Sequence, residues 1–313
     1  MAIQTKTSKA PVTVPTVVTL EEKVRALRSS VNIGLRPIRA MDDLMGISPN
    51  KVTSKVPEPL ELRPEELWVD SDYQRDLSRA SMKLILNMVN KWDWRKFKPP
   101  VVTVTAENRY VVIDGQHTAI AAATHPDIVK IPCMFVKMDD VADQANAFVA
   151  HNTARVRVTG LDLFHARNRG GDESVSEIYD LTTRAGVTIV RYVPGAAGLH
   201  KPNETAAIGV MEQLYRRYGA MHFREIMSVV GQCGFAPIRA DHIKAVALIL
   251  YEREPGEPQL SAELLVKLIS SLNDADSLMQ AARMATTTNS TKAVALANYW
   301  RNKYREHHNP RAR

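Results

Sequence analysis

Strand-like patterns are confined to one part of this chain. Short runs of β-branched residues alternate with helical patterns in residues 57–158, whereas residues 159–313 carry helical periodicity almost throughout. Alternating strands and helices predict a small α/β domain. Residues 1–56 are rich in Thr, Val, Pro, Ser and Lys and hold one short helical stretch, so we expect a basic, largely flexible arm. The predicted fold is therefore α+β: this arm, a small α/β domain and an all-helical domain with a basic tail.

The α/β domain is expected to place its strands around one hairpin. An edge strand starts at Pro57, a helix follows with Ser78 as its cap, and residues 106–109 join the strands VVTVT and YVVID. The domain ends with the strand IPCMFV and the helix DVADQANAFVAHNT, in which Val141 and Val149 share the apolar side. Between these parts, one strand runs directly into a helix at YVVIDGQHTAIAAA.

The second half is expected to be helical. Most of its predicted helices begin at Asp, Asn, Ser or Thr, which are the preferred N-cap residues. A loop, PGAAGLHKPNET, interrupts them beside a short strand pattern, VTIVRYV. The segment SVSEIYDLTTRAGVTI resembles the first helix and turn of a helix-turn-helix, but no clean recognition helix follows it. We expect this domain to contact DNA or to form a homodimer. The alternative is a purely structural role, in which its helices only pack against one another.

The charge balance favours a polyanion as partner. The chain holds 41 Lys and Arg against 34 Asp and Glu, which gives a net charge of +7 and a pI near 9.3. Much of the excess lies near both ends, as in arms that contact phosphate or in solvated tails. Basic and aromatic residues also interleave in the helical domain, which makes five residues candidate nucleic-acid contacts: Arg216, Arg217, Arg301, Lys303 and Arg305. The alternative is that their aromatic neighbours pack in the core.

Several classes of protein are excluded. Cys133 and Cys233 are too few for a thiolate zinc site, and both are expected to be reduced core residues. No window approaches the roughly 18 consecutive apolar residues of a membrane span, and the start does not resemble a signal peptide. The G-x-S-x-G and H-E-x-x-H motifs of hydrolases and metalloproteases are missing. We therefore expect a soluble, cytoplasmic protein, with association with the nucleoid as one expectation.

The strand-to-helix turn is the strongest candidate for a binding site. The strand ends at Asp114, Gly115 permits a tight turn, and the helix begins within two residues. The free N–H groups near Gln116, His117 and Thr118 favour a phosphate or a carboxylate in front of them. Asp114 could hold a metal ion, and His117 could donate a hydrogen bond or act as an acid or base. The alternative is that Asp114 caps the helix and His117 is only its partner.

Residues 60–166 resemble the ParB/sulfiredoxin superfamily, and in particular the ParB N-terminal domain often labelled ParB-like nuclease. The helical half looks more like that of phage or mobile-element members than that of chromosome-partition proteins. Four segments appear in the family's order: Tyr73-Gln74-Arg75, KPPVVTV, DGQHTAIAA from Asp114 to Ala122, and AFVAHNTARVRVTGLDLFHA with Asn152 and Arg155 at the matching places.

The resemblance implies a nucleoside triphosphate site, for CTP or ATP with Mg²⁺. Gly115, Gln116 and His117 would face the triphosphate, and Gln74 and Arg75 would line the other wall. Asn152 and Arg155 would close over the phosphates or the metal, with Asp114 and Asn152 as tentative Mg²⁺ ligands. Thr118 stands where the family usually has Arg, which removes a charge-assisted phosphate contact of about 1.5–3 kcal/mol. Nucleotide binding is therefore expected to be weakened, altered or lost.

These observations favour a ParB-like, DNA-associated protein with a nucleotide or phosphate site at the turn. One alternative is an enzyme on the same scaffold, a metal-dependent nuclease or a nucleotide hydrolase such as a CTPase. In that case Asp114 and Asn152 would hold Mg²⁺, and His117 would be the acid or base. Another alternative is a degenerate regulatory module that binds no nucleotide and docks a protein partner.

Overall fold

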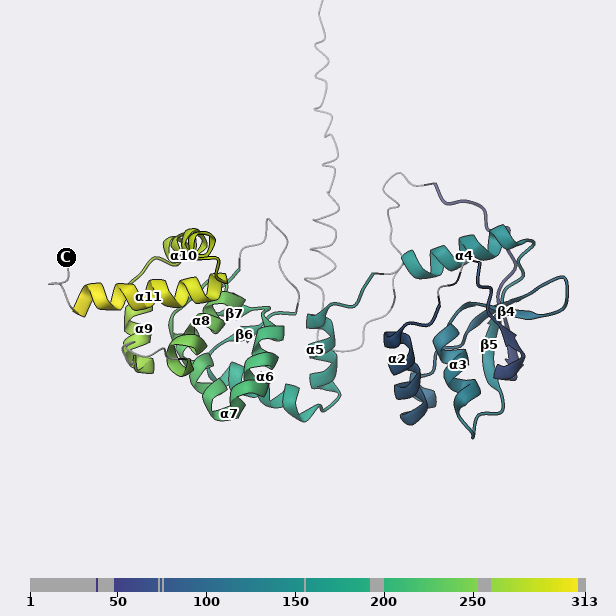
Figure 1. The fold of residues 1–313 in the computed structure, drawn as a ribbon, viewed down its shortest axis with the longest axis horizontal. Coiled ribbons are helices and arrows are strands. Elements are labelled where there is room, and N and C mark those ends of the chain that lie inside the picture. Colours follow the sequence, from purple (N-terminus) through teal and green to yellow (C-terminus); the bar gives the residue numbers. More distant parts are fainter. Residues whose placement is uncertain are drawn as a thin grey trace, which may run out of the picture. The chain divides into compact units, whose positions relative to one another are not determined.

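The chain forms two compact units. In a computed structural model, the first unit comprises Met1–His151 and the second comprises Asn152–Arg313 (Figure 1). The boundary between them falls in the last turn of the helix α4. The expected N-terminal arm lies mostly outside the described residues. The structure describes residue 38 and the ranges 48–72, 74, 76–154, 156–191, 200–252 and 260–308.

The first unit is built on a five-stranded mixed sheet in the order β1-β5-β3-β4-β2. β1 pairs antiparallel with β5, β3 pairs antiparallel with β4, and the pairs β3/β5 and β2/β4 are parallel. The predicted hairpin and edge strand are confirmed. The elements are β1 (Glu58–Leu62), η1 (Pro64–Glu66), β2 (Leu67–Trp68), α2 (Arg79–Asn90), η2 (Trp94–Lys96), β3 (Val101–Val104), β4 (Tyr110–Asp114), α3 (Gln116–Thr124), β5 (Ile131–Phe135) and α4 (Val141–Thr153).

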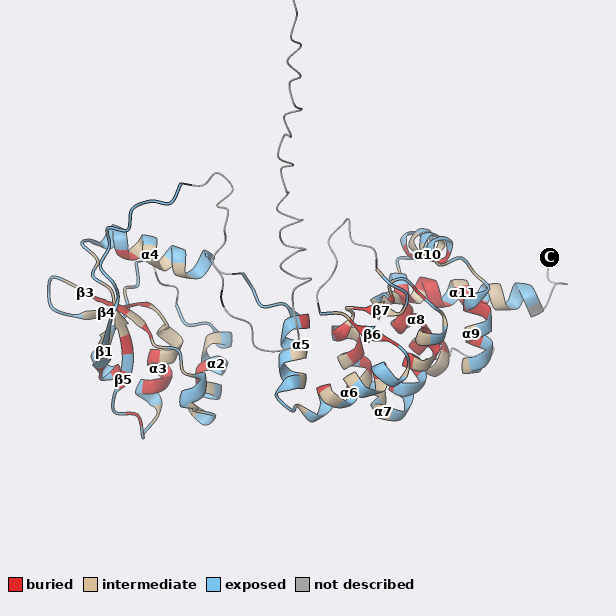
Figure 2. Ribbon diagram, turned by 180° about the vertical axis from the view of Figure 1, so that it is seen from behind, coloured by how far each residue is buried: buried red, intermediate tan, exposed pale blue. Residues whose placement is uncertain are grey.

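The core of this unit lies between the sheet and α3. Val102, Val112 and Cys133 are fully buried on the strands, and α3 presents alanines that let it lie close to them (Figure 2). Burial raises the pKa of the Cys133 thiol to about 11, so the residue is an inert part of the core. Cys133 and Cys233 are both free, as predicted.

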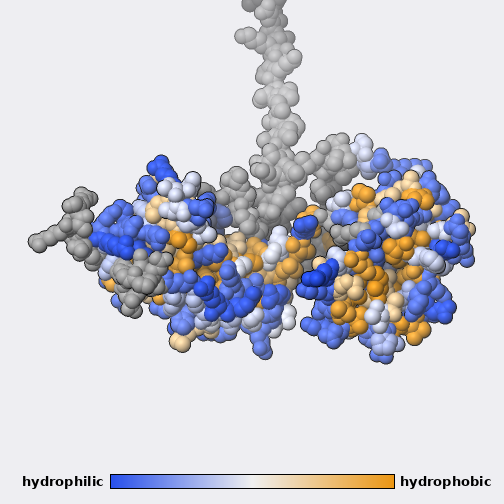
Figure 3. All heavy atoms as spheres, in the orientation of Figure 1, coloured by the Kyte–Doolittle hydropathy of each residue, from blue (hydrophilic) through white to orange (hydrophobic). Residues whose placement is uncertain are grey.

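Several apolar side chains of the first unit face solvent instead. Met82 and Leu86 on α2 are exposed, and Figure 3 shows hydrophobic residues gathered on the visible face of this unit. Val141 and Val149 on α4 are also exposed, although the sequence pattern predicts one apolar side for this helix. A periodic pattern identifies such a side, but it does not say whether another element lies against it.

The second unit is helical, as predicted. Side chains cap its helices where the sequence indicates: Thr159 and Asp162 form a capping box, and Asn273 accepts from the Asp276 N–H. Its elements are α5 (Gly160–Arg169), α6 (Glu173–Arg184), β6 (Thr188–Ile189), β7 (Glu204–Thr205), α7 (Ile208–Gln232), α8 (Ala240–Tyr251), α9 (Ala262–Ser270), α10 (Asp274–Thr288) and α11 (Lys292–His308). None of the described helices is long and apolar enough to cross a membrane.

Two features of this unit agree with the sequence pattern. Gly219, with φ 74°, interrupts α7 where the pattern separates two helical segments. The candidate helix-turn-helix has no recognition helix, because the strand β6 follows α6 where a second helix would begin. A large core holds the unit together, and Trp300, Phe223 and Phe164 are among its fully buried side chains.

Candidate functional site at the β4–α3 turn

The turn between β4 and α3 has the geometry that the sequence predicts. Gly115 is the N-cap of α3, with φ 95° and ψ 21°, in the left-handed region that favours glycine. A Cβ atom at this position would lie 3.0 Å from the Cα of Pro100. Glycine is therefore required both by its backbone conformation and by its close approach to the segment that leads into β3.

The first turn of α3 has no side-chain cap. The first bond within the helix runs from the Ala119 N–H to the Gly115 carbonyl at 3.0 Å. The N–H groups of Gln116, His117 and Thr118 therefore point ahead of the helix, where they can bind an anion. The alternative that Asp114 caps this helix is wrong.

Asp114 pairs with a lysine instead. Its carboxylate accepts from the Lys98 ammonium at 2.7 Å, and the aspartate side chain is mostly buried while the lysine is exposed. The exposed ammonium of this pair lies beside the turn, next to the carboxylate. Among the described residues, His117 makes no side-chain hydrogen bond or ion pair, so its ring remains available to a ligand.

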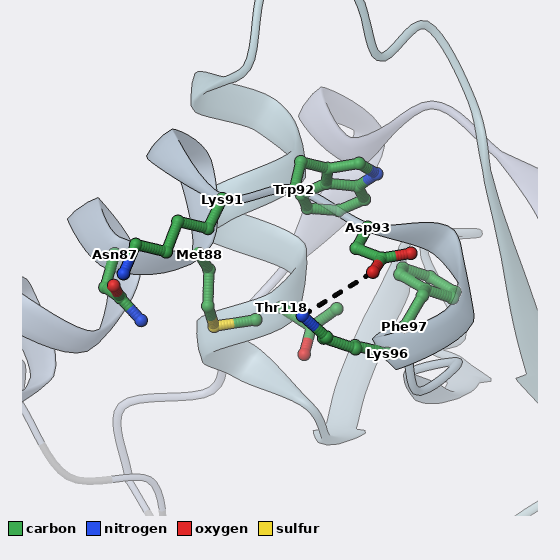
Figure 4. Close-up of a pocket in the computed structure, with 8 residues that line it drawn as sticks. All are labelled: Asn87, Met88, Lys91, Trp92, Asp93, Lys96, Phe97 and Thr118. Carbon is green, nitrogen blue, oxygen red and sulfur yellow. Dashed lines mark ion pairs between the residues drawn. The ribbon is translucent and has the colours of Figure 1, made fainter. Parts of the chain in front are cut away.

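A pocket of about 180 Å³ opens beside the same turn (Figure 4). Thr118 lines it together with Lys91 and Lys96, and the rings of Trp92 and Phe97 form apolar walls. Figure 4 shows the Lys96 ammonium directed to Asp93, at 3.5 Å. Sequence reasoning missed these lysines, although the run KWDWRKFK at residues 91–98 could have revealed them, because it interleaves basic and aromatic residues.

The other described residues expected at the site do not line the pocket beside Thr118. Gln74 is buried and its side-chain amide donates to the Val112 carbonyl, so it fastens its loop to β4. Gln116 lines a second pocket, of about 280 Å³, with Pro64 and Ile120. Asn152 lies exposed in the last turn of α4. Arg75 and Arg155 lie outside the described residues, and their roles and that of Asn152 stay predictions.

The described residues contain no group of three or more His, Cys, Asp or Glu side chains that could hold a metal ion. The Lys98 ammonium lies against Asp114, where a cation would otherwise bind. The carboxylate therefore fits the lysine better than it fits Mg²⁺, and the assignment of Asp114 and Asn152 to Mg²⁺ stays a prediction.

Two of the arginines expected to contact nucleic acid lie together on α7. Arg216 is exposed. Arg217 forms an ion pair with Glu252 at 3.0 Å and lies over the ring of Tyr218. Burial and a hydrogen bond to Glu252 raise the pKa of that tyrosine to about 12. The tyrosine therefore belongs to a packed cluster and is not a free base-stacking ring.

The candidates on α11 are also engaged within the unit. Arg301 is buried and donates to the carbonyls of Leu248 and Glu252, so it closes the C-terminal end of α8. Lys303 pairs with Glu306 at 2.7 Å, and Arg305 donates to Asn302 at 3.2 Å. A phosphate contact by Arg301 would require it to leave both carbonyls, and Trp300 beside it belongs to the core.

Comparison with known proteins adds similarities of fold. No protein-family model and no curated protein matches the chain. Three of the similar solved structures are of ParB proteins. A C-terminally truncated chromosome-partitioning protein ParB from Caulobacter crescentus, complexed with CTP-γ-S, is 14% identical, with a TM-score of 0.31 over 78% of this chain and 98% of that chain.

Two further structures are similar at the same level. The Caulobacter ParB complexed to the centromeric parS site is 15% identical, with a TM-score of 0.26 over 77% of this chain and 98% of that one. A Pnob8-like ParB-N domain is 12% identical, with a TM-score of 0.26 over 75% of this chain and 82% of that one. These similarities are too low to assign a family or a ligand.

Proposed function

We propose that this chain is a DNA-associated protein that binds a nucleoside triphosphate at the β4–α3 turn. One observation carries the proposal: the uncapped first turn of α3 begins at a left-handed glycine, beside lysines that come from neighbouring segments. Free N–H groups, the positive end of a helix and nearby cations together favour a phosphate group. The sequence resemblance to the ParB family points to the same class of ligand.

Residues of the turn and its neighbours would each make a contact with the phosphates. The N–H groups of Gln116, His117 and Thr118 would donate to phosphate oxygens, and the His117 ring would add a donor. Lys98, held in position by Asp114, would supply a positive charge. The Thr118 hydroxyl is a weaker phosphate ligand than an arginine, so we expect a lower affinity than an arginine at this position would give.

The helical unit is proposed to contribute the DNA contacts. Support comes from the net charge of +7 and from Arg216, which is exposed on α7. Each phosphate contact to duplex DNA lowers the slope of log affinity against log salt by about 0.9. We expect Arg216→Gln to make this slope less negative by about 0.9 in a duplex retention assay. An unchanged slope would remove Arg216 from the DNA surface.

The nucleotide part is tested by thermal stability. CTP, ATP, GTP and UTP are each added with and without Mg²⁺ to the wild type, to Thr118→Arg and to a control, Thr124→Arg, which adds the same charge at the other end of α3. A ligand at 100 times its Kd stabilises the folded state by about 2.7 kcal/mol, which raises the Tm visibly. We expect one nucleotide to stabilise the wild type and to stabilise Thr118→Arg further, with no such gain in the control.

Other results would favour the alternatives. If no nucleotide stabilises any variant, the proposed site is wrong and a degenerate, partner-docking module becomes the better interpretation. Strand cleavage that EDTA stops and that Asp114→Ala abolishes would favour the metal-dependent nuclease.

A further inference from the structure

The segment from Lys91 to Lys98, here called the aromatic-basic segment, is used only in part by the proposed nucleotide site, because Trp94 and Arg95 lie outside the lining of the pocket. It reads KWDWRKFK, with four basic residues, three aromatic residues and one acidic residue. It connects α2 to β3 and contains the single turn of η2. Alternation of this kind is typical of surfaces that bind unpaired bases and their phosphates.

The rings of Trp92, Trp94 and Phe97 all contact one another. Trp94 contacts Trp92 edge-on at 5.3 Å and Phe97 at 5.0 Å between ring centroids. Trp92 also contacts Phe97, at 5.7 Å. Asp93 caps η2 by accepting from the Arg95 N–H at 3.0 Å. The orientation of Trp94 is therefore fixed before any partner arrives, and a partner would not have to order it.

Trp94 is nevertheless half exposed, at 50%. Tryptophan is highly buried on average, so a tryptophan that is half exposed needs an explanation. Its neighbours Arg95 and Lys96 are mostly exposed, and Asp93 is the acid that pairs with both. Lys91 has no ion-pair partner within the described parts of the chain. The surface around the ring therefore keeps a positive charge.

We propose that the aromatic-basic segment binds single-stranded nucleic acid, with a base stacked on Trp94 and phosphates bound by the surrounding cations. In a duplex the bases are already stacked on one another, so an indole fixed at the surface can be used only by an unpaired base. An apolar protein partner is a poorer fit, because it would have to bury several exposed cations.

The contrast with α11 strengthens the choice of segment. The sequence YWRNKYREHH at residues 299–308 has the same kind of alternation, but Trp300 is fully buried and Arg301 is engaged with α8. Of these two segments, only the aromatic-basic segment offers an exposed tryptophan. The inference goes beyond the proposed function, because it does not require a nucleotide at the β4–α3 turn.

The test compares two equally exposed tryptophans in the full chain. Trp68 lies on β2 and is 49% exposed, so Trp68→Ala is a matched control for Trp94→Ala. Binding of an oligothymidylate of about 12 nucleotides is measured by fluorescence anisotropy at about 50 mM salt. We expect Trp94→Ala to weaken binding about 5- to 150-fold, as loss of one stacked base does, and Trp68→Ala to change it little.

A second pair of variants tests the cations. Lys91→Gln should reduce the salt slope for the oligonucleotide by about 0.7, whereas Lys130→Gln, an exposed lysine before β5, should leave it unchanged. The proposal is overturned if the chain does not bind the oligonucleotide, if Trp94→Ala binds like the wild type, or if duplex DNA shows the same loss. Titration of Trp94→Ala with CTP keeps the two proposals separate, because Trp94, unlike Lys91, lies outside the lining of the pocket beside Thr118 and its loss should leave nucleotide binding unchanged.

Discussion

The ammonium of Lys98 and the carboxylate of Asp114 meet at 2.7 Å, although sixteen positions separate them in the sequence. They meet because β3 and β4 pair antiparallel with Val101 opposite Asp114, so Lys98, three positions before Val101, lies beside the end of β4. This contact gives the acidic end of β4 a cationic partner. A negatively charged ligand can therefore approach the turn without meeting an unpaired carboxylate.

Asp114→Asn is expected to strengthen binding of a triphosphate in the absence of Mg²⁺, by up to about tenfold. The change removes a negative charge next to the site and leaves Lys98 able to pair with a phosphate. The ion pair itself contributes no more than about 1 kcal/mol to stability, because the lysine is exposed. Isothermal titration checks this. Weaker binding that appears only with Mg²⁺ would instead support Asp114 as a metal ligand.

Gly115→Ala is expected to destabilise the first unit by more than 2 kcal/mol. A non-glycine residue in the left-handed region costs roughly 1–2 kcal/mol, and the contact with Pro100 adds to that. Gly186→Ala separates the two effects, because Gly186 has φ 75° and open space around it. Chemical denaturation of both variants should show the larger loss at Gly115, and similar losses would mean that the contact with Pro100 adjusts easily.

His117→Ala is expected to weaken triphosphate binding by roughly 1–3 kcal/mol, the range of a hydrogen bond to a charged group. Since the ring has no hydrogen-bond partner in the described structure, stability should change by less than about 0.5 kcal/mol. Titration calorimetry and thermal unfolding of the same preparation check both quantities. A large loss of stability together with binding would show that His117 has a structural role.

Arg301→Met is expected to lower the free energy of unfolding of the helical unit by about 1–3 kcal/mol, because two carbonyls at the end of α8 lose a charged donor. Arg305→Met, on the exposed side of the same helix, should change it by less than about 0.5 kcal/mol. Urea denaturation gives both values. If Arg301→Met instead leaves stability intact and weakens DNA binding, the arginine acts at the DNA surface.

Lowering the pH from about 4 toward 2 is expected to destabilise η2 in the aromatic-basic segment, because Asp93 caps it. Hydrogen bonds from the Arg95 side chain and then from its backbone N–H lower the pKa of Asp93 from 3.8 to about 2. Because the pKa is lower in the folded state, this stabilisation is complete above about pH 4 and is lost as the pH falls toward 2.

Tryptophan fluorescence of the wild type should therefore change in this range of pH, and Asp93→Asn should lack that step. Identical acid titrations of the two proteins would contradict the role of Asp93 in holding η2.

The sequence predicts the β4–α3 turn well, because a β-branched run, a glycine and an alanine-rich helix are local signals. It does not predict the partner of Asp114, which depends on the register between β3 and β4. The same limit applies to the tryptophans. Trp94 and Trp300 lie in similar alternations of basic and aromatic residues, yet one is half exposed and the other is fully buried. Exposure is decided by which distant elements pack against a residue, and no local pattern carries that information.

The close approach of Gly115 to Pro100 also limits how the turn can respond to a ligand. The carbonyl of Pro100 accepts from the Met134 N–H on β5 at 2.8 Å, so the segment against which Gly115 packs is itself bonded to a neighbouring strand. A displacement of Gly115 toward Pro100 would press on this bonded segment. An anion would therefore meet donors that are already ordered, and little of its binding free energy would be lost in ordering the backbone.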